Sequence, residues 1–94
     1  MDRDAHQELG TLLFDQGNAA GAVREFGAVI ASKPVDPARA HFDLARAYHL
    51  NKQNEQAKDE LVTALETAPG YRQAQKLLLE LSSQSGTQPI SPKK

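Results

Sequence analysis

Three histidines are the side chains of this chain best suited to catalysis or metal binding. His41 and His49 are eight positions apart, about 80° around a helix, so they do not form the i, i+4 pair that binds a metal from one helix face. His6 and His41 are separated by 35 residues, an interval that recurs between other similar residues and favours a packing role. We therefore predict no catalytic residue, no metal site and no cofactor, and a protein that is not an enzyme.

The carboxylates and thiols add no reactive cluster. Cysteine is absent, which excludes thiolate zinc sites and cysteine nucleophiles. Four carboxylates follow a spacing that is typical of the solvated face of a single helix: Glu55, Asp59, Glu60 and Glu66. We expect them to face water and to bind no cation.

Recognition is the chemistry that remains, and its best candidates lie between residues 37 and 50. One side of this stretch carries residues at i, i+3, i+7 and i+10: Arg39, Phe42, Arg46 and His49. The other side carries His41, Leu44 and Tyr48, which we expect to face the core. An exposed aromatic ring between two arginines is typical of an interface anchor, so we expect Phe42 to point away from the core. The alternative is that Phe42 and Phe14 are buried by neighbouring helices.

Length and charge limit the possible partners. Ninety-four residues, 39% of them hydrophobic, are enough for one small domain with a modest core. The net charge of −1 gives no electrostatic footprint for nucleic acid or for an anionic membrane, and we predict neither as a partner. No apolar run could span a bilayer, and the acidic start of the chain does not resemble a signal peptide. The compartment is left open.

The elements that position these residues are predicted to be helices. Glycine, proline and asparagine divide the chain into five stretches of about 12–15 residues, each with apolar residues at helical spacing. Asn18 and the pair Asp36-Pro37 are typical helix starts, and Pro34 and Pro69 end the stretches before them. Short loops between such helices favour antiparallel neighbours. We predict an all-α fold of five helices.

The chain also repeats itself. Eight pairs of similar residues are separated by 35 positions: His6 and His41, Leu9 and Leu44, Gly10 and Ala45, Leu13 and Tyr48, Ala22 and Ala57, Phe26 and Leu61, Val29 and Ala64, and Pro34 and Pro69. Through these residues the chain resembles the tetratricopeptide repeat family, whose unit is a helix–turn–helix of about 34 residues. The resemblance implies a right-handed α-solenoid over residues 3–83. It divides into repeat one (3–35), repeat two (36–69) and a capping helix (70–83). The polar composition of residues 84–94 predicts a disordered tail.

Four residues depart from the family pattern. His6 and His41 stand where the family usually has tryptophan. Lys52 replaces the glycine that Gly17 provides in the first unit, so we expect Asn51 to take the left-handed conformation there. Leu79 stands where Gly10 and Ala45 are small, which fits a last helix that no partner helix follows.

The resemblance implies a function in protein–protein interaction. In this family the first helix of each unit lines a concave groove that holds a peptide or helix of a partner. The predicted groove residues are Gln7, Thr11, Phe14, Arg39, Phe42, Arg46, His49 and Lys76. The arginines and Lys76 favour a ligand that combines acidic character with an apolar side chain.

The sequence also allows two other functions. The chain has only two and a half repeats and no N-terminal cap, so it could be an assembly element that self-associates through repeat one. Leu12 is then the candidate contact, unless it is partly buried against the second helix. The chain could also be the accessory C-terminal domain of a larger enzyme.

Overall fold

Five α-helices make up the fold. The structure is a computed structural model that describes residues 3–85 of the chain, with side chains for residues 5–83. The helices are α1 (Arg3–Asp15), α2 (Ala19–Ala31), α3 (Pro37–Leu50), α4 (Asn54–Thr67) and α5 (Arg72–Ser85). No strand occurs within the described range, which confirms the predicted all-α class. Helix α5 ends two residues after the predicted capping helix, and the rest of the predicted tail, 86–94, lies outside the described residues.

Side chains begin the helices where the sequence predicts. The Asn18 side chain accepts a hydrogen bond from the Gly21 N–H at 3.0 Å and begins α2. The Asp36 carboxylate accepts one from the Arg39 N–H at 3.2 Å and begins α3, with Pro37 in its first turn. Each cap satisfies a backbone donor that the helix itself leaves without a partner.

The turn between α3 and α4 corrects one prediction. Lys52 itself takes the left-handed conformation, with φ of 63°, whereas Asn51 has φ of −85°. The reason is the hydrogen bonding at the helix end, where the Gln53 N–H donates to the Tyr48 carbonyl at 2.8 Å. This closing pattern needs a positive φ at the residue before Gln53, which is the position that Gly17, with φ of 82°, occupies in the first unit.

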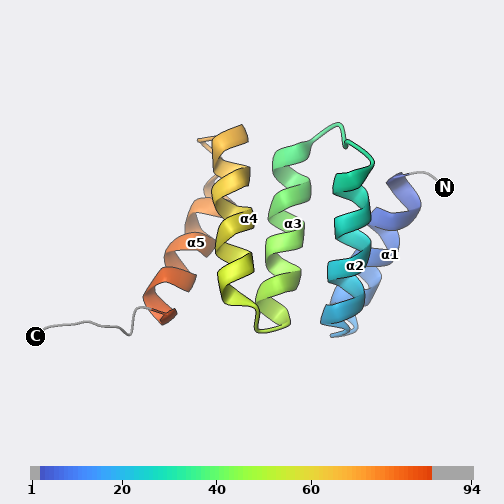
Figure 1. The fold of residues 1–94 in the computed structure, drawn as a ribbon, viewed down its shortest axis with the longest axis horizontal. Helices are drawn as coiled ribbons and strands as arrows, with labels where there is room; N and C mark the ends of the chain where they lie inside the picture. Colours follow the sequence, from blue (N-terminus) through green and yellow to red (C-terminus); the bar gives the residue numbers. More distant parts are fainter. Residues whose placement is uncertain (1–2, 86–94) are drawn as a thin grey trace, which may run out of the picture.

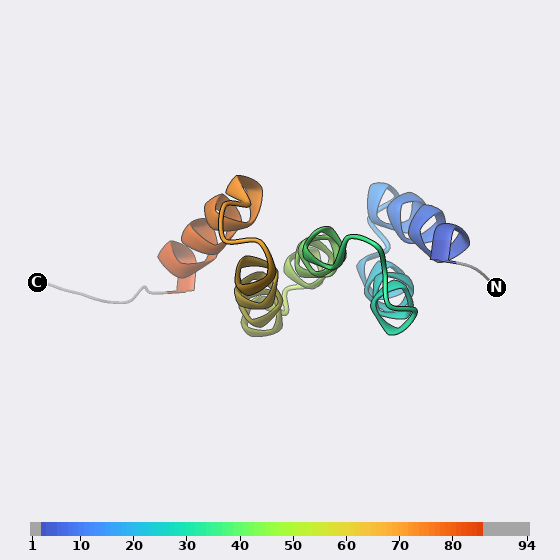
Figure 2. The same cartoon turned by 90° about the horizontal axis from the view of Figure 1, so that it is seen from above.

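The helices form a single row of antiparallel neighbours, from α1 at one end to α5 at the other (Figure 1). Each helix packs mainly on its neighbours along the chain. Seen from above, α2 and α4 lie on one side of the row (Figure 2). Helices α1 and α5 lie on the opposite side, farther out than α3. This arrangement is a helical-repeat solenoid. The side bordered by α1, α3 and α5, where Phe14, Arg46 and Leu77 line one cavity, is called the hollow face.

Small residues let the two helices of each unit approach closely. A Cβ atom at Gly10 of α1 would lie 2.7 Å from the ring of Phe26 in α2. In the second unit Ala45 of α3 and Leu61 of α4 belong to one cluster and are fully buried. The position 35 residues after Gly10 thus stays small for the same reason, because a large side chain there would push the helices apart.

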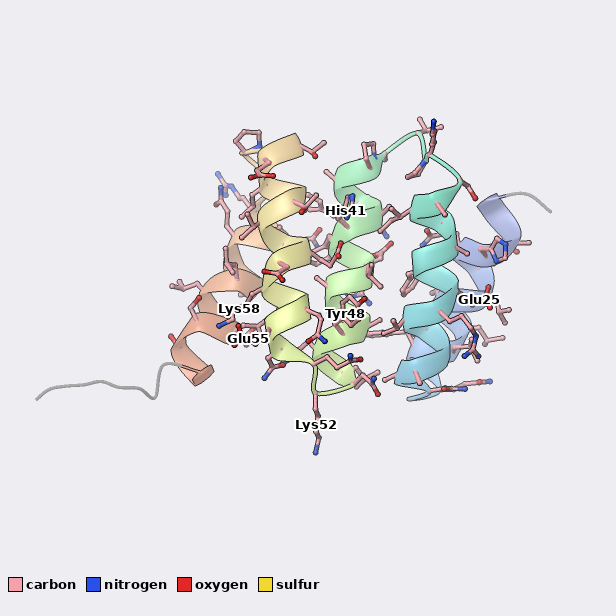
Figure 3. The ribbon with its side chains drawn as sticks, viewed as in Figure 1. Glu25, His41, Tyr48, Lys52, Glu55 and Lys58 are labelled. Atoms are coloured by element: carbon pink, nitrogen blue, oxygen red, sulfur yellow. The ribbon has the colours of Figure 1, made fainter. Side chains whose placement is uncertain are left out.

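A histidine–glutamate pair also joins the two helices of each unit. His6 Nδ1 lies 2.7 Å from Glu25 Oε1, and His41 Nδ1 lies 2.6 Å from Glu60 Oε1. These pairs recur at the 35-residue interval and occupy the place of the usual tryptophan contact. Figure 3 labels one residue of each pair, Glu25 on α2 and His41 on α3. The expectation that Glu60 faces water is wrong, since it is half-buried against α3.

Candidate functional site

A buried carboxylate organises the hollow face. Asp43 lies in the middle of α3 with only 2% of its surface exposed. It accepts a hydrogen bond from Gln7 Nε2 of α1 at 3.1 Å, and from Arg39 Nε and Arg46 Nη1 of its own helix at 3.3 Å each. Burying a carboxylate is unfavourable without such partners. Asp43 therefore fixes α1 against α3 and holds both arginines in place.

Arg46 lies between two aromatic rings from different helices. Its guanidinium carbon is 4.5 Å from the ring centroid of Phe14 in α1 and 5.7 Å from that of Phe42 in α3. Both distances are within the range of cation–π attraction. The Arg46 side chain keeps 36% of its surface exposed. The result is a cation whose position is fixed before any ligand arrives and which still faces solvent.

Phe42 is not the exposed anchor that the sequence predicts. Only 7% of its surface is exposed, and its ring centroid lies 5.2 Å from that of Tyr71, directly before α5. The prediction is wrong because Tyr71 and buried residues of α4 and α5 cover the side of the Phe42 ring that was expected to be open. Partial burial of the Tyr71 phenol raises its pKa above the ordinary value of 10.0.

Charge is unevenly distributed around this cluster. The Asp43 carboxylate raises the pKa of Arg39 above its ordinary value, so Arg39 stays cationic. Two arginines face a single carboxylate, which leaves the cluster with a net positive charge.

A cavity of about 420 Å³ adjoins Arg46 on the hollow face. Its lining joins apolar and basic side chains from α1, α3, α4, α5 and the turn after α3: Phe14, Arg46, His49, Leu50, Lys52, Asn54 and Leu77. His49 Nδ1 is held 3.1 Å from Asn54 Oδ1. Lys52 extends from the turn between α3 and α4 (Figure 3). The cavity thus offers apolar walls beside positive charge.

The predicted groove residues divide into three groups. Five of them form one cluster, in which Gln7, Arg39 and Arg46 bond to Asp43, and Phe14 and Phe42 flank Arg46. His49 lines the cavity together with Phe14 and Arg46, and Thr11 is exposed on α1. Lys76 lies elsewhere, in a shallow depression on the outer face of α5.

Sequence reasoning missed Asp43, and a signal for it was present. Asp43 follows Arg39 by four residues and precedes Arg46 by three, the two spacings at which opposite charges meet on a helix. The contributions of Leu50, Lys52 and Leu77 had no comparable signal, because they come from the end of α3, from the turn after it and from α5.

The described part of the chain contains no metal-binding cluster. No group of three or more histidine, aspartate or glutamate side chains converges within residues 5–83.

None of the described helices is both long and apolar enough to cross a bilayer.

Comparison with known families decides the classification. The family model described as tetratricopeptide repeat matches residues 13–81, which is most of the chain. The chain belongs to the tetratricopeptide repeat family. Comparisons with curated proteins and with solved structures gave no match. Tetratricopeptide repeats generally act as protein–protein interaction modules and are typically non-catalytic. The two units and the last helix of this chain fit two such repeats and a capping helix.

Proposed function

We propose that the hollow face of this tetratricopeptide repeat protein binds a segment of a partner protein, and that this segment presents an acidic group next to an apolar side chain. The observation that carries the proposal is the position of Arg46, which is fixed by Asp43 and Phe14 beside an apolar cavity. A cation held in place loses less conformational entropy on binding than a mobile one.

The chemistry of the lining supports the acidic part of the ligand. Arg46 presents a planar set of donors, which suits a carboxylate, and its contact with Asp43 involves one of its terminal nitrogens. Lys52 adds a second positive charge at the same cavity. A basic ligand would meet repulsion from both side chains.

The shape of the cavity supports the apolar part of the ligand. Phe14, Leu50 and Leu77 supply apolar surface from three different helices. Its volume of about 420 Å³ is in the range that binds drug-sized groups, so it can hold a leucine-sized or phenylalanine-sized side chain.

The hypothesis that this chain is an accessory domain of a larger enzyme stays a prediction, because no described residue bears on it.

Arg46→Ala is expected to weaken peptide binding by about 10-fold to 100-fold, the range for losing hydrogen bonds to a charged group. The probe is a set of peptides selected from a random phage-displayed library on the wild-type protein. We expect the selected sequences to pair aspartate or glutamate with a large apolar residue. Affinity is measured by fluorescence anisotropy with the synthetic peptides.

Arg24→Ala is the matched control, because Arg24 is an exposed arginine of α2, away from the cavity. It should bind the selected peptides as the wild type does. Arg46→Lys should bind more tightly than Arg46→Ala and less tightly than the wild type, since it keeps the charge but loses the planar guanidinium group. If both alanine variants bind with equal affinity, the hollow face is not the site.

A further inference from the structure

The outer face of α1 carries apolar residues at positions that are buried elsewhere in the fold. Leu9 and Leu12 are 42% and 52% exposed. The residues 35 positions later, Leu44 and Ala47 of α3, are buried against Ala22 and Phe26 of α2. Because the units are equivalent, the outer face of α1 has the character of a surface that packs against a neighbouring helix.

The outer face of α5 is open at the other end of the row. Leu79 is 70% exposed. Its equivalents in the first helices of the two units are Gly10, which Phe26 approaches, and Ala45, which is fully buried. A shallow depression of about 400 Å³ surrounds Leu79, and Arg72 and Lys76 line it.

Each outer face carries two like charges beside its exposed leucine, acidic on α1 and basic on α5. On α1, Glu8 and Asp15 lie four residues before and three residues after Leu12, and both are exposed. On α5, Arg72 and Lys76 lie seven and three residues before Leu79. None of these four charged side chains forms an ion pair with another of the side chains placed in the structure. The two faces lie at opposite ends of the row, so they cannot meet within one molecule (Figures 1 and 2).

We propose that the outer face of α1 binds the outer face of α5 of a second copy of this chain. Complementary charge selects this pairing, since two α1 faces together would oppose Glu8 and Asp15 to their own copies. A contact between unlike faces at opposite ends does not close on two molecules. The copies therefore add head to tail and extend the row of helices.

Sedimentation velocity on the full chain tests whether copies associate. One helix face on each side makes a small interface, so we expect association in the range of about 10 μM to about 1 mM. The weight-average sedimentation coefficient should rise across this range and fall back in high salt, where the charges are screened. A sedimentation coefficient that stays at the monomer value over the whole range overturns the proposal. The outer face of α1 would then be a candidate site for a different protein.

Charge reversal identifies the two faces. The variant Glu8→Lys with Asp15→Lys should stay monomeric, because both of its ends are basic. The variant Arg72→Glu with Lys76→Glu should also stay monomeric, because both of its ends are acidic. An equimolar mixture of the two restores every unlike pair, so its association should return to near the wild-type level. If the α5 variant still associates as the wild type does, copies meet through another surface and the proposal fails.

Val62→Glu and Leu12→Glu form the matched comparison for unspecific apolar contact. Val62 is 45% exposed on α4, outside both proposed faces. We expect Leu12→Glu to abolish association and Val62→Glu to leave it unchanged, with the helical circular dichroism of both preserved. Equal loss in both variants would show unspecific adhesion and overturn the proposal.

Discussion

Replacing Gly10 by leucine is expected to lower the free energy of unfolding by about 3 kcal/mol, at the upper end of the range for overpacking a core. Even the first added carbon would lie 2.7 Å from the buried ring of Phe26, and the remaining three have no free volume. The side chain can enter only if α1 and α2 move apart, which also weakens the contact between His6 and Glu25. In a domain of this size, such a loss is a large part of the total stability.

Gly27→Leu is the control for this change. Gly27 also lies within a helix, but nothing lies within 4 Å of a Cβ atom built there. The substitution should leave stability unchanged or raise it by up to about 1 kcal/mol, since leucine favours a helix more than glycine does. Urea unfolding followed by circular dichroism measures both variants. Equal stability of the two would contradict the close approach of α1 and α2.

Asp43→Ala is expected to lower the free energy of unfolding by about 2–3 kcal/mol. The substitution leaves Gln7, Arg39 and Arg46 without their shared acceptor. Breaking a buried ion pair typically costs about 3–5 kcal/mol, and the value is smaller here because Arg39 and Arg46 can turn toward water. The measurement is the same urea titration, and Arg46 should then lose its fixed position over Phe14 as well.

Asp59→Ala provides the comparison for Asp43, because Asp59 is an exposed carboxylate of α4. Its removal should change stability by no more than about 0.5 kcal/mol, as is usual for surface substitutions. Asp43→Asn should fall between the two, since an amide oxygen still accepts a hydrogen bond but carries no charge. Little effect from Asp43→Ala would mean that the carboxylate does not join α1 to α3.

The repeat made most of the fold predictable from sequence. The eight pairs at the 35-residue interval fix which helices are equivalent, and the caps at Asn18 and Asp36 follow from local hydrogen bonding alone. Gly10 was predictable as a point of close approach for the same reason. Local rules also explain the one error in a turn, because the helix end sets φ at Lys52 whichever residue stands there.

Phe42 and Asp43 were harder to place because periodicity separates a helix into only two faces. In a solenoid an inner helix is covered on more than one side. The buried residues of α3 extend around most of its circumference, and they are Ala38, Ala40, Phe42, Asp43, Leu44, Ala45 and Ala47. The spacing of residues within α3 does not show which of these side chains lies toward α5. That depends on how α5 packs on the rest of the fold. The cavity lining was unpredictable on the same ground, since Leu77 and Lys52 reach it only through the stacking of the helices.

Chemical-shift mapping by NMR tests the central claim, that the hollow face around Arg46 is the binding surface, most directly. The ¹⁵N-labelled protein is titrated with a peptide selected on the wild type. The account predicts that the largest shifts arise from amides near Phe14, Arg46 and Lys52 and from the middle of α5 around Leu77. Shifts concentrated near Arg24 of α2 and Val62 of α4, with the amides around Arg46 unmoved, would contradict it.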